Sequence, residues 1–270
     1  MVDSRFKEKF QRAEKQRLSG DYVGALRSYR RCLEFLDKET QPRAYIVTRF
    51  RIAKAARLSG CIEDSALELG SLARDKSLPE EVQVEAAETL AQLRMDHSSV
   101  SEARDAIDFA LELAMRAGNL SAKARMHGNL GVLALRDGDW ATAKQNLLVS
   151  ADIFGAVPDP GGQAQAWTAL GEAASRVGRL ADASEYFEDS FRLLVQLGSL
   201  EQAAVCRAAF GQILRRRGQS RDANRVFGEV FAILEGGGGD RLAGAALDLA
   251  AAKMDLGDWC AADLEIVRAE

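Results

Sequence analysis

The sequence has little of what breaks helices or builds strands. Its 270 residues include only four prolines, and aromatic residues make up 7% of the chain. Runs of β-branched residues with period-two alternation are missing, so strands are not expected. The abundant residues are instead good helix formers, chiefly alanine, leucine, arginine and glutamate. The composition therefore predicts an all-α fold.

Signals for a membrane, for secretion and for disulfides are also missing. No apolar run approaches the ~20 residues that a bilayer requires. The opening residues, MVDSRFKEKFQRAEKQ, contain no apolar core of a signal peptide. The four cysteines, Cys32, Cys61, Cys206 and Cys260, are scattered and form no C-x-x-C motif. We expect a cytoplasmic protein with reduced cysteines. The formal net charge of −4 argues against nucleic acid as a partner.

Recognisable catalytic, metal and cofactor motifs are missing as well. The two histidines, His97 and His127, have no neighbouring ligands, and no Ser-His-Asp or Cys-His set can be assembled. The run EGGGGD at 235–240 lacks the lysine of a phosphate loop, and PDPGGQ at 158–163 is interpreted as a turn. We expect no enzyme, no cofactor and no metal.

What the chain does have is a repeat of about forty residues. Glycines recur at spacings of 40, 78, 40, 40 and 39 residues, and one further unit, without glycine near Ser98, fills the gap of 78. These glycines are Gly20, Gly60, Gly138, Gly178, Gly218 and Gly257. The spacing predicts a single array over residues 1–270, with units at about 4–40, 41–78, 79–118, 119–160, 161–198, 199–238 and 239–270.

Each unit is predicted to be a pair of antiparallel helices. The turn glycine ends the first helix, because glycine adopts positive φ without a steric penalty. The second helix then carries a small residue at the closest approach and a bulky residue one turn later. Small residues are Ala25, Ser65, Ala103, Ala143, Ala183, Ala223 and Ala262; bulky ones are Tyr29, Leu69, Ile107, Leu147, Phe187, Phe227 and Ile266. The first helix carries a bulky–small pair such as Leu170–Gly171. We interpret all these positions as packing.

The stretch WTALGEAASRVGRLADASEYF at 167–187 resembles the tetratricopeptide repeat (TPR), whose pattern is W-x₂-L-G-x₂-Y followed by A-x₃-F. Trp167, Leu170, Gly171, Ala183 and Phe187 match it, whereas an alanine replaces the tyrosine. The resemblance implies a right-handed superhelical solenoid of about seven helix-turn-helix units, whose first helices line a concave groove.

The long unit is similar to the repeats of Pins/LGN-type polarity adaptors and kinesin light chain. The segment ARMHGNLGVLALRDGDWATA at 124–143 keeps Arg125 and Asn129 of the LGN-type repeat. In that family these two positions face the groove and hold extended peptides, so the resemblance implies the same role here.

The exposed inner positions of the first helices are mostly basic or amide residues, with Glu172 as the acid among them. The predicted groove residues are Arg51, Lys54, Arg57, Arg125, Asn129, Arg136, Glu172, Arg176, Gln212, Arg215 and Arg216. Unit three instead offers the acids Glu85, Glu88 and Asp96. Arginine binds carboxylates bidentately, which favours a partly acidic peptide. The alternative is that these arginines lie on solvated helix faces and contact nothing.

Two functions follow as hypotheses. The first is a non-enzymatic adaptor or scaffold that binds an extended, partly acidic segment of another protein. The alternative is a ligand- or peptide-sensing regulatory TPR domain of a signalling or transcriptional regulator. The last unit has no polar capping helix after DLEIVRAE. The apolar residues Leu264, Ile266 and Val267 therefore indicate either self-association or a fragment of a longer protein.

Overall fold

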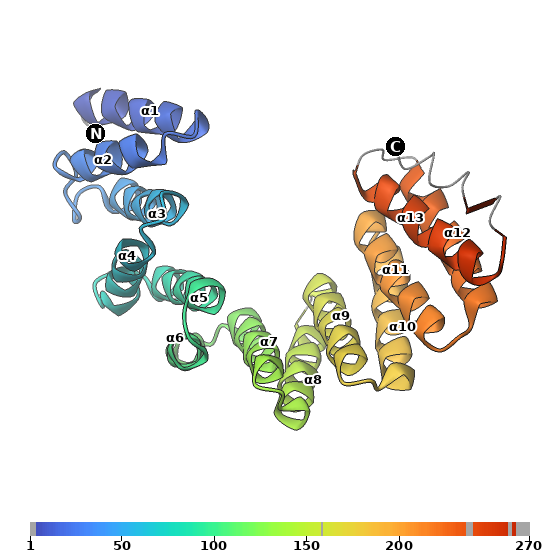
Figure 1. Ribbon diagram of the computed structural model, residues 1–270. Coiled ribbons are helices and arrows are strands. Elements are labelled where there is room, and N and C mark those ends of the chain that lie inside the picture. Colours follow the sequence, from blue (N-terminus) through green and yellow to red (C-terminus); the bar gives the residue numbers. More distant parts are fainter. Residues whose placement is uncertain (1–3, 158, 236–239, 259–260, 263–270) are drawn as a thin grey trace. The chain divides into compact units, whose positions relative to one another are not determined.

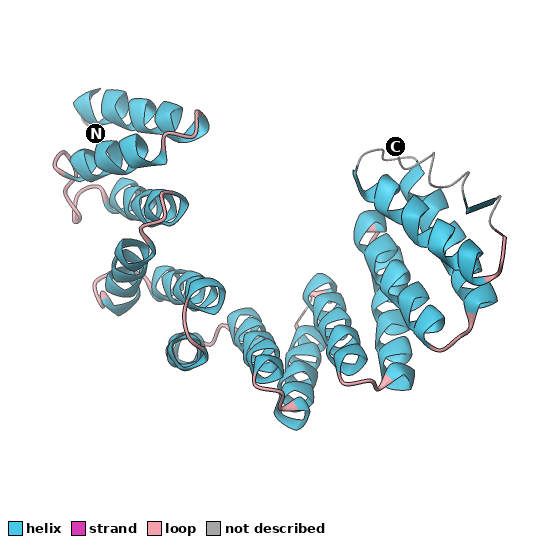
Figure 2. Ribbon diagram, in the orientation of Figure 1, coloured by secondary structure: helices cyan, strands magenta, loops and turns pink. Residues whose placement is uncertain are grey.

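The computed structural model describes residues 4–157, 159–235, 240–258 and 261–262 (Figure 1). The glycine run 236–239 and the apolar residues Leu264, Ile266 and Val267 lie outside these ranges. Every regular element within them is an α-helix, and they contain no strand (Figure 2). The predicted all-α class is confirmed.

The helices follow one another in pairs joined by short turns. Their bounds are α1 (Ser4–Leu18), α2 (Tyr22–Leu33), α3 (Pro42–Leu58), α4 (Ile62–Arg74), α5 (Glu80–His97), α6 (Val100–Arg116), α7 (Leu120–Arg136), α8 (Trp140–Ala156), α9 (Pro160–Arg176), α10 (Leu180–Gln196), α11 (Leu200–Arg216), α12 (Ser220–Glu235) and α13 (Asp240–Asp255).

The chain divides into two compact units, Met1–Ala122 and Lys123–Glu270. In the first unit each helix from α1 to α6 packs on the next, and in the second the same holds from α8 to α13. Packing between sequence neighbours is the arrangement of a TPR-like solenoid. The seven-unit division of a single right-handed array stays a prediction.

Positive φ angles occur where the repeat predicted them. Gly178, for example, follows α9 with φ +79, and the next residue, Arg179, donates its N–H to Ala174 O at 2.8 Å. The glycines with positive φ are Gly20, Gly60, Gly118, Gly138, Gly178, Gly198, Gly218 and Gly257. Gly118 and Gly198 were not predicted; they follow second helices and form turns of the same kind.

The unit that lacks a turn glycine uses a different solution. Ser98 follows α5 in an extended conformation with φ −124, which any residue adopts. Ser99 then caps α6 through a capping box, in which Glu102 N–H donates to the Ser99 hydroxyl and the Glu102 carboxylate accepts from Ser99 N–H. The side-chain cap makes a left-handed residue unnecessary here.

The predicted turn at 158–163 is wrong for its second half. Helix α9 begins at Pro160, and Asp159 caps it by accepting the N–H of Gly162 at 2.9 Å. Proline at the first helical position needs no N–H partner, so aspartate and proline together start a helix. Gly162 lies inside this helix and has to be glycine, because a β-carbon there would come within 2.5 Å of the Phe154 ring.

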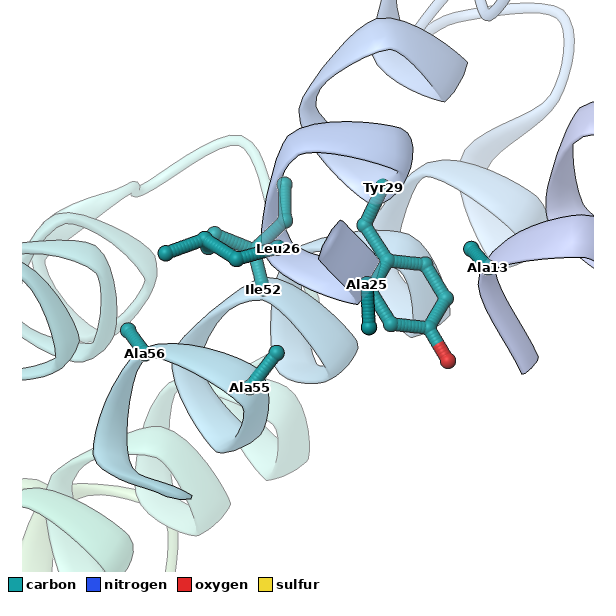
Figure 3. Close-up of a cluster of buried hydrophobic side chains, with 7 residues drawn as sticks. All are labelled: Ala13, Ala25, Leu26, Tyr29, Ile52, Ala55 and Ala56. Atoms are coloured by element: carbon teal, nitrogen blue, oxygen red, sulfur yellow. The ribbon is translucent and has the colours of Figure 1, made fainter. Parts of the chain in front are cut away.

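The small and bulky positions that the structure describes are buried as predicted. Figure 3 shows this in the first unit, where Ala25 and Tyr29 of α2 lie in one buried cluster with Ala13 of α1 and Ile52 of α3. Both Ala25 and Tyr29 are fully buried. Each helix pair therefore supplies one hydrophobic layer, and its outer face is covered by the next helix.

Candidate functional site

A hollow of about 460 Å³ lies in the first unit between α3, α4 and α5. We call it the α3–α5 hollow. Its base is apolar and includes the buried side chains of Ala53, Leu69 and Leu93. The remaining lining is Ile46, Val47, Phe50, Arg51, Lys54 and Arg57 from α3, Ser65 from α4, and Glu85, Thr89 and Gln92 from α5. The three residues of α3 that were predicted to line the groove, Arg51, Lys54 and Arg57, therefore line the same hollow.

The second unit has two adjoining hollows on α9 and α11, of about 310 and 380 Å³, which share Glu172. We call them together the α9–α11 surface. Gln165, Thr168, Ala169, Leu194, Gln202, Val205 and Cys206 line the first hollow with Glu172, and Ser175, Arg176, Phe187, Ala209, Gln212, Ile213 and Arg216 line the second. Glu172, Arg176, Gln212 and Arg216 were predicted for this surface.

Arg51 is already engaged within the protein. Its Nε lies 3.0 Å from Glu14 Oε1 of α1. Glu14 also accepts a hydrogen bond from the buried Tyr29 hydroxyl at 2.6 Å and from Arg17 at 2.7 Å. Burial alone would raise the pKa of Glu14, but these hydrogen bonds and cations outweigh it and lower the pKa below its usual value. Arg51 thus contributes to joining α3 to α1.

Three residues predicted on α11 are engaged in a similar way. Gln212 donates to Asp248 Oδ1 at 2.5 Å, and Arg215 lies 2.7 Å from Asp255, so both hold α13. Arg216 reaches back to α9, where it donates to the Ser175 hydroxyl at 2.7 Å. Burial raises the pKa of the Asp248 carboxyl. These contacts join consecutive repeats.

The other predicted charged side chains on the two surfaces have no described ion-pair partner. Within the described residues, Lys54 and Arg57 make no ion pair or side-chain hydrogen bond, and the same holds for Glu172 and Arg176. Arg57 and Arg176 lie in the last turn of their helices, where the helix dipole favours a cation without any ligand. Lys54 lies one turn earlier, so the dipole accounts for it less well.

The residues that the LGN-type resemblance selected lie on α7. Arg125 is exposed and Asn129 is half-buried, and Arg136 lies in the last turn. Arg125 and Arg136 each interact with another residue. The hollows described above do not include these three side chains, so their role in binding stays a prediction.

Sequence reasoning placed Phe50 among the inner positions of α3 but missed two other apolar residues of the α3–α5 hollow. Ile46 and Val47 line it, and Val47 is 49% exposed although it is a large aliphatic residue. A signal was available, because Val47 stands 38 residues before Glu85 and the pair Ile52–Ala53 stands 38 residues before Leu90–Ala91. Both therefore occupy the same repeat position.

The buried polar groups near the α9–α11 surface are structural. Thr168, Ser190 and Cys206 form a chain of contacts, with Thr168 Oγ1 2.8 Å from Ser190 Oγ and 3.1 Å from Cys206 Sγ. Ser190 donates to the carbonyl of Ala164 at 2.8 Å, and none of these contacts involves a basic side chain.

Among the described residues no group of three His, Cys, Asp or Glu side chains is placed to hold a metal ion. In the same part of the chain no helix has the length and apolarity needed to span a bilayer.

Residues 162–236 match the family model of the tetratricopeptide repeat. The rest of the chain has the same fold, as its similarity to solved TPR structures shows. The family match covers less than a third of the chain, so outside residues 162–236 the comparisons show the TPR fold alone. Comparison of the sequence with curated proteins gave no significant match.

Three solved structures share the fold at low sequence identity. A signal transduction ATPase (STAND) protein with a TPR sensor, from Pyrococcus horikoshii, is 14% identical with a TM-score of 0.74; the alignment covers 97% of this chain and 40% of that one. Aspartyl phosphate phosphatase F from Bacillus subtilis is 13% identical with a TM-score of 0.67, over 98% of this chain and 69% of that one. A Rap protein complexed with Competence and Sporulation Factor is 14% identical with a TM-score of 0.58, over 100% and 78%.

At such low sequence identities, the structural similarity establishes the fold and no shared function. The chain spans 40% of the length of the STAND protein, so the match covers only part of that molecule. The predicted likeness to Pins/LGN adaptors and kinesin light chain, as a subclass, stays a prediction.

Proposed function

We propose that the protein is a non-enzymatic adaptor that binds an extended, partly acidic segment of another protein on the inner faces of its first helices. The repeat fold is in general an interaction scaffold. The Rap protein of the same fold was crystallised in complex with Competence and Sporulation Factor. The observation that carries the acidic preference is the α3–α5 hollow, where Lys54 and Arg57 face an apolar base without a described counter-ion.

An absence of catalytic groups is part of the proposal. One protein of similar fold is called a phosphatase, but its name transfers no activity at 13% identity. We also propose that the protein acts in the cytoplasm and binds neither nucleic acid nor membranes, and that its last unit self-associates. The three described cysteines, Cys32, Cys61 and Cys206, are unpaired, which is consistent with a reducing compartment.

The test is peptide binding measured by fluorescence polarisation. Peptides selected from a random library on the whole chain should include acidic members, and their affinity should fall as ionic strength rises. The double variant Lys54→Ala/Arg57→Ala should weaken binding at least tenfold. A matched control, Arg27→Ala/Arg31→Ala, removes two exposed charges from α2 and should bind normally. Failure to select any peptide would contradict the adaptor function.

The alternative is a sensor domain, and one observation favours it. The STAND structure that covers 97% of this chain carries its repeats as a sensor, and the α3–α5 hollow has the volume of a small-ligand pocket. A sensor should show a thermal shift with a small metabolite and no stable protein partner. An adaptor should show the opposite pair of results.

A further inference from the structure

The α3–α5 hollow has chemically different ends. Along α3 the lining residues run from apolar to basic, with Val47 in the first half of the helix, Phe50 at its middle, and Lys54 and Arg57 in the second half. All four line one hollow, so this order is a gradient along a single surface. A ligand lying along α3 therefore meets an apolar region first and two cations afterwards.

Helix α5 supplies a matching gradient. Glu85 lies in its first half and Gln92 in its second, and both line the hollow. Because the buried pairs Ile52–Ala53 and Leu90–Ala91 fix a register of 38 residues, Glu85 is equivalent to Val47 and Gln92 to Lys54. Helices α3 and α5 run in the same direction, since α4 reverses the chain between them. One end of the hollow therefore combines Glu85 with the apolar side chain of Val47. The other end combines Lys54 and Arg57 with the amide of Gln92.

The charges at both ends are available. Lys54, Arg57 and Glu85 form no ion pair with any other described residue, whereas Arg51 beside them is held by Glu14. Gln92 has one described partner, the Asp96 carboxylate at 2.8 Å. A helix dipole accounts for a cation in a last turn, but it does not account for Lys54 or for the unpaired Glu85.

Helix geometry sets the spacing of the ligand. Phe50 and Lys54 are four residues apart, about 6 Å along the axis, and the midpoint between Lys54 and Arg57 is about 8 Å from Phe50. Two residues of extended peptide span about 7 Å, and side chains two residues apart point to the same face. An acidic side chain two residues from an apolar one therefore reaches the cations while the apolar one covers Phe50.

We propose that the α3–α5 hollow selects an extended peptide with an apolar residue at its centre, an acidic residue two positions to one side and a basic residue two positions to the other. The acidic group lies between Lys54 and Arg57, the apolar side chain lies over Phe50, and the basic group lies at Glu85. This inference rests on the proposed function and specifies its ligand.

The experiment starts with selection from an unbiased twelve-residue peptide library on the whole chain. Enriched sequences should carry basic-x-apolar-x-acidic, in one chain direction. Moving the acidic residue one position closer to the apolar one should weaken binding at least tenfold, because the acid then faces away from α3.

Charge exchange tests the orientation. Lys54→Glu/Arg57→Glu should lose the selected peptide and bind one whose acidic residue is replaced by lysine. Glu85→Lys should prefer a peptide whose basic residue is replaced by glutamate. An exchanged preference cannot arise from misfolding, so it separates recognition from stability. Arg27→Glu/Arg31→Glu makes the same change in net charge on α2 and should leave the preference unchanged.

The outcomes separate the two proposals. Selected peptides without the alternating pattern, or with affinities that the α3 and α5 variants do not alter, overturn this inference and leave the adaptor function standing. No selected peptide at all overturns both.

Discussion

Gly171 of α9 lies against the ring of Phe187 in α10 so closely that a β-carbon on Gly171 would come within 2.9 Å of it. The same relationship recurs one repeat earlier and one later, between Gly131 and Leu147 at 2.6 Å and between Gly211 and Phe227 at 2.7 Å. Glycine is therefore a steric requirement at this repeat position in α7, α9 and α11.

The first prediction follows from that contact. Gly171→Ala should lower the free energy of unfolding by about 1–2 kcal/mol, because overpacking costs more than the ~1 kcal/mol that alanine gains in helix propensity. Denaturant unfolding followed by circular dichroism measures it. Gly228→Ala is the control: no atom lies within 4 Å of its added β-carbon, so this variant should be stabilised. Equal effects of the two substitutions would refute the steric account.

Arg207 joins three consecutive helices, and its loss should be costly. Its guanidinium lies 2.8 Å from Glu188 of α10 and 2.7 Å from Glu229 of α12, and it stacks near Phe191 and Phe210. The side chain is only 14% exposed. Arg207→Met keeps the apolar stem but leaves Glu229 without a cation and Glu188 with only the exposed Arg192, so it should cost on the order of 2 kcal/mol.

The control for Arg207 is Arg192, which also pairs with Glu188. Its contacts are 3.6 and 3.7 Å long and its side chain is 65% exposed. Arg192→Met should change stability by less than about 0.5 kcal/mol, because exposed pairs are screened. Thermal melts of both variants decide the point, and a similar loss in both would contradict the bridging role of Arg207.

Asp75 should make stability depend on pH. The Lys38 ammonium, and then the Ser77 hydroxyl, hydrogen-bond its carboxylate and lower its pKa to about 2 from an ordinary 3.8. A lowered folded-state pKa adds stability above about pH 4, and this stability is lost as the pH falls from 4 towards 2. Asp75→Asn should therefore be less stable than the parent chain at pH 7, by on the order of 1 kcal/mol.

The measurement is the urea midpoint of both chains between pH 7 and pH 3. Their difference should shrink below pH 4, and Lys38→Met should show the same trend because it removes the same contact. A difference that stays constant over this range would argue against the Lys38–Asp75 interaction.

The cysteines should differ in reactivity. Cys32 is fully buried, and burial raises the pKa of its thiol to about 11, whereas Cys61 is exposed. The thiolate is the reactive form, so iodoacetamide should modify Cys61 well before Cys32 in the folded protein. Peptide mapping by mass spectrometry measures the two rates separately. In urea the rates should converge, and early modification of Cys32 without urea would contradict its burial.

The fold was predictable because its determinants are local and repeated. Gly178, Ala183 and Phe187 recur at one period, and each copy of the pattern states the same steric requirement. Gly162 shows the limit: within PDPGGQ the glycines favoured a turn, but the Asp159 cap and Pro160 start a helix. The glycine at position 162 is needed for a different reason, since it leaves room for the ring of Phe154.

The candidate site was less predictable because long side chains choose among several partners. The sequence places Arg51, Lys54 and Arg57 on one face of α3, and the structure brings all three to one hollow. It does not reveal that Glu14, 37 positions earlier, takes Arg51, or that Asp255 takes Arg215. Helical periodicity predicts which face a side chain occupies, whereas its ion-pair partner depends on the neighbouring repeat.

The contacts between helices have a consequence for protein synthesis. Those that join neighbouring repeats span about one repeat, as with the 40 positions between Arg215 and Asp255. The unit Met1–Ala122 is compact by itself, and its helices pack in chain order. Such short-range contacts favour fast folding that proceeds from the N-terminus. We therefore expect the first unit to form its core while the ribosome is still adding the residues of the second.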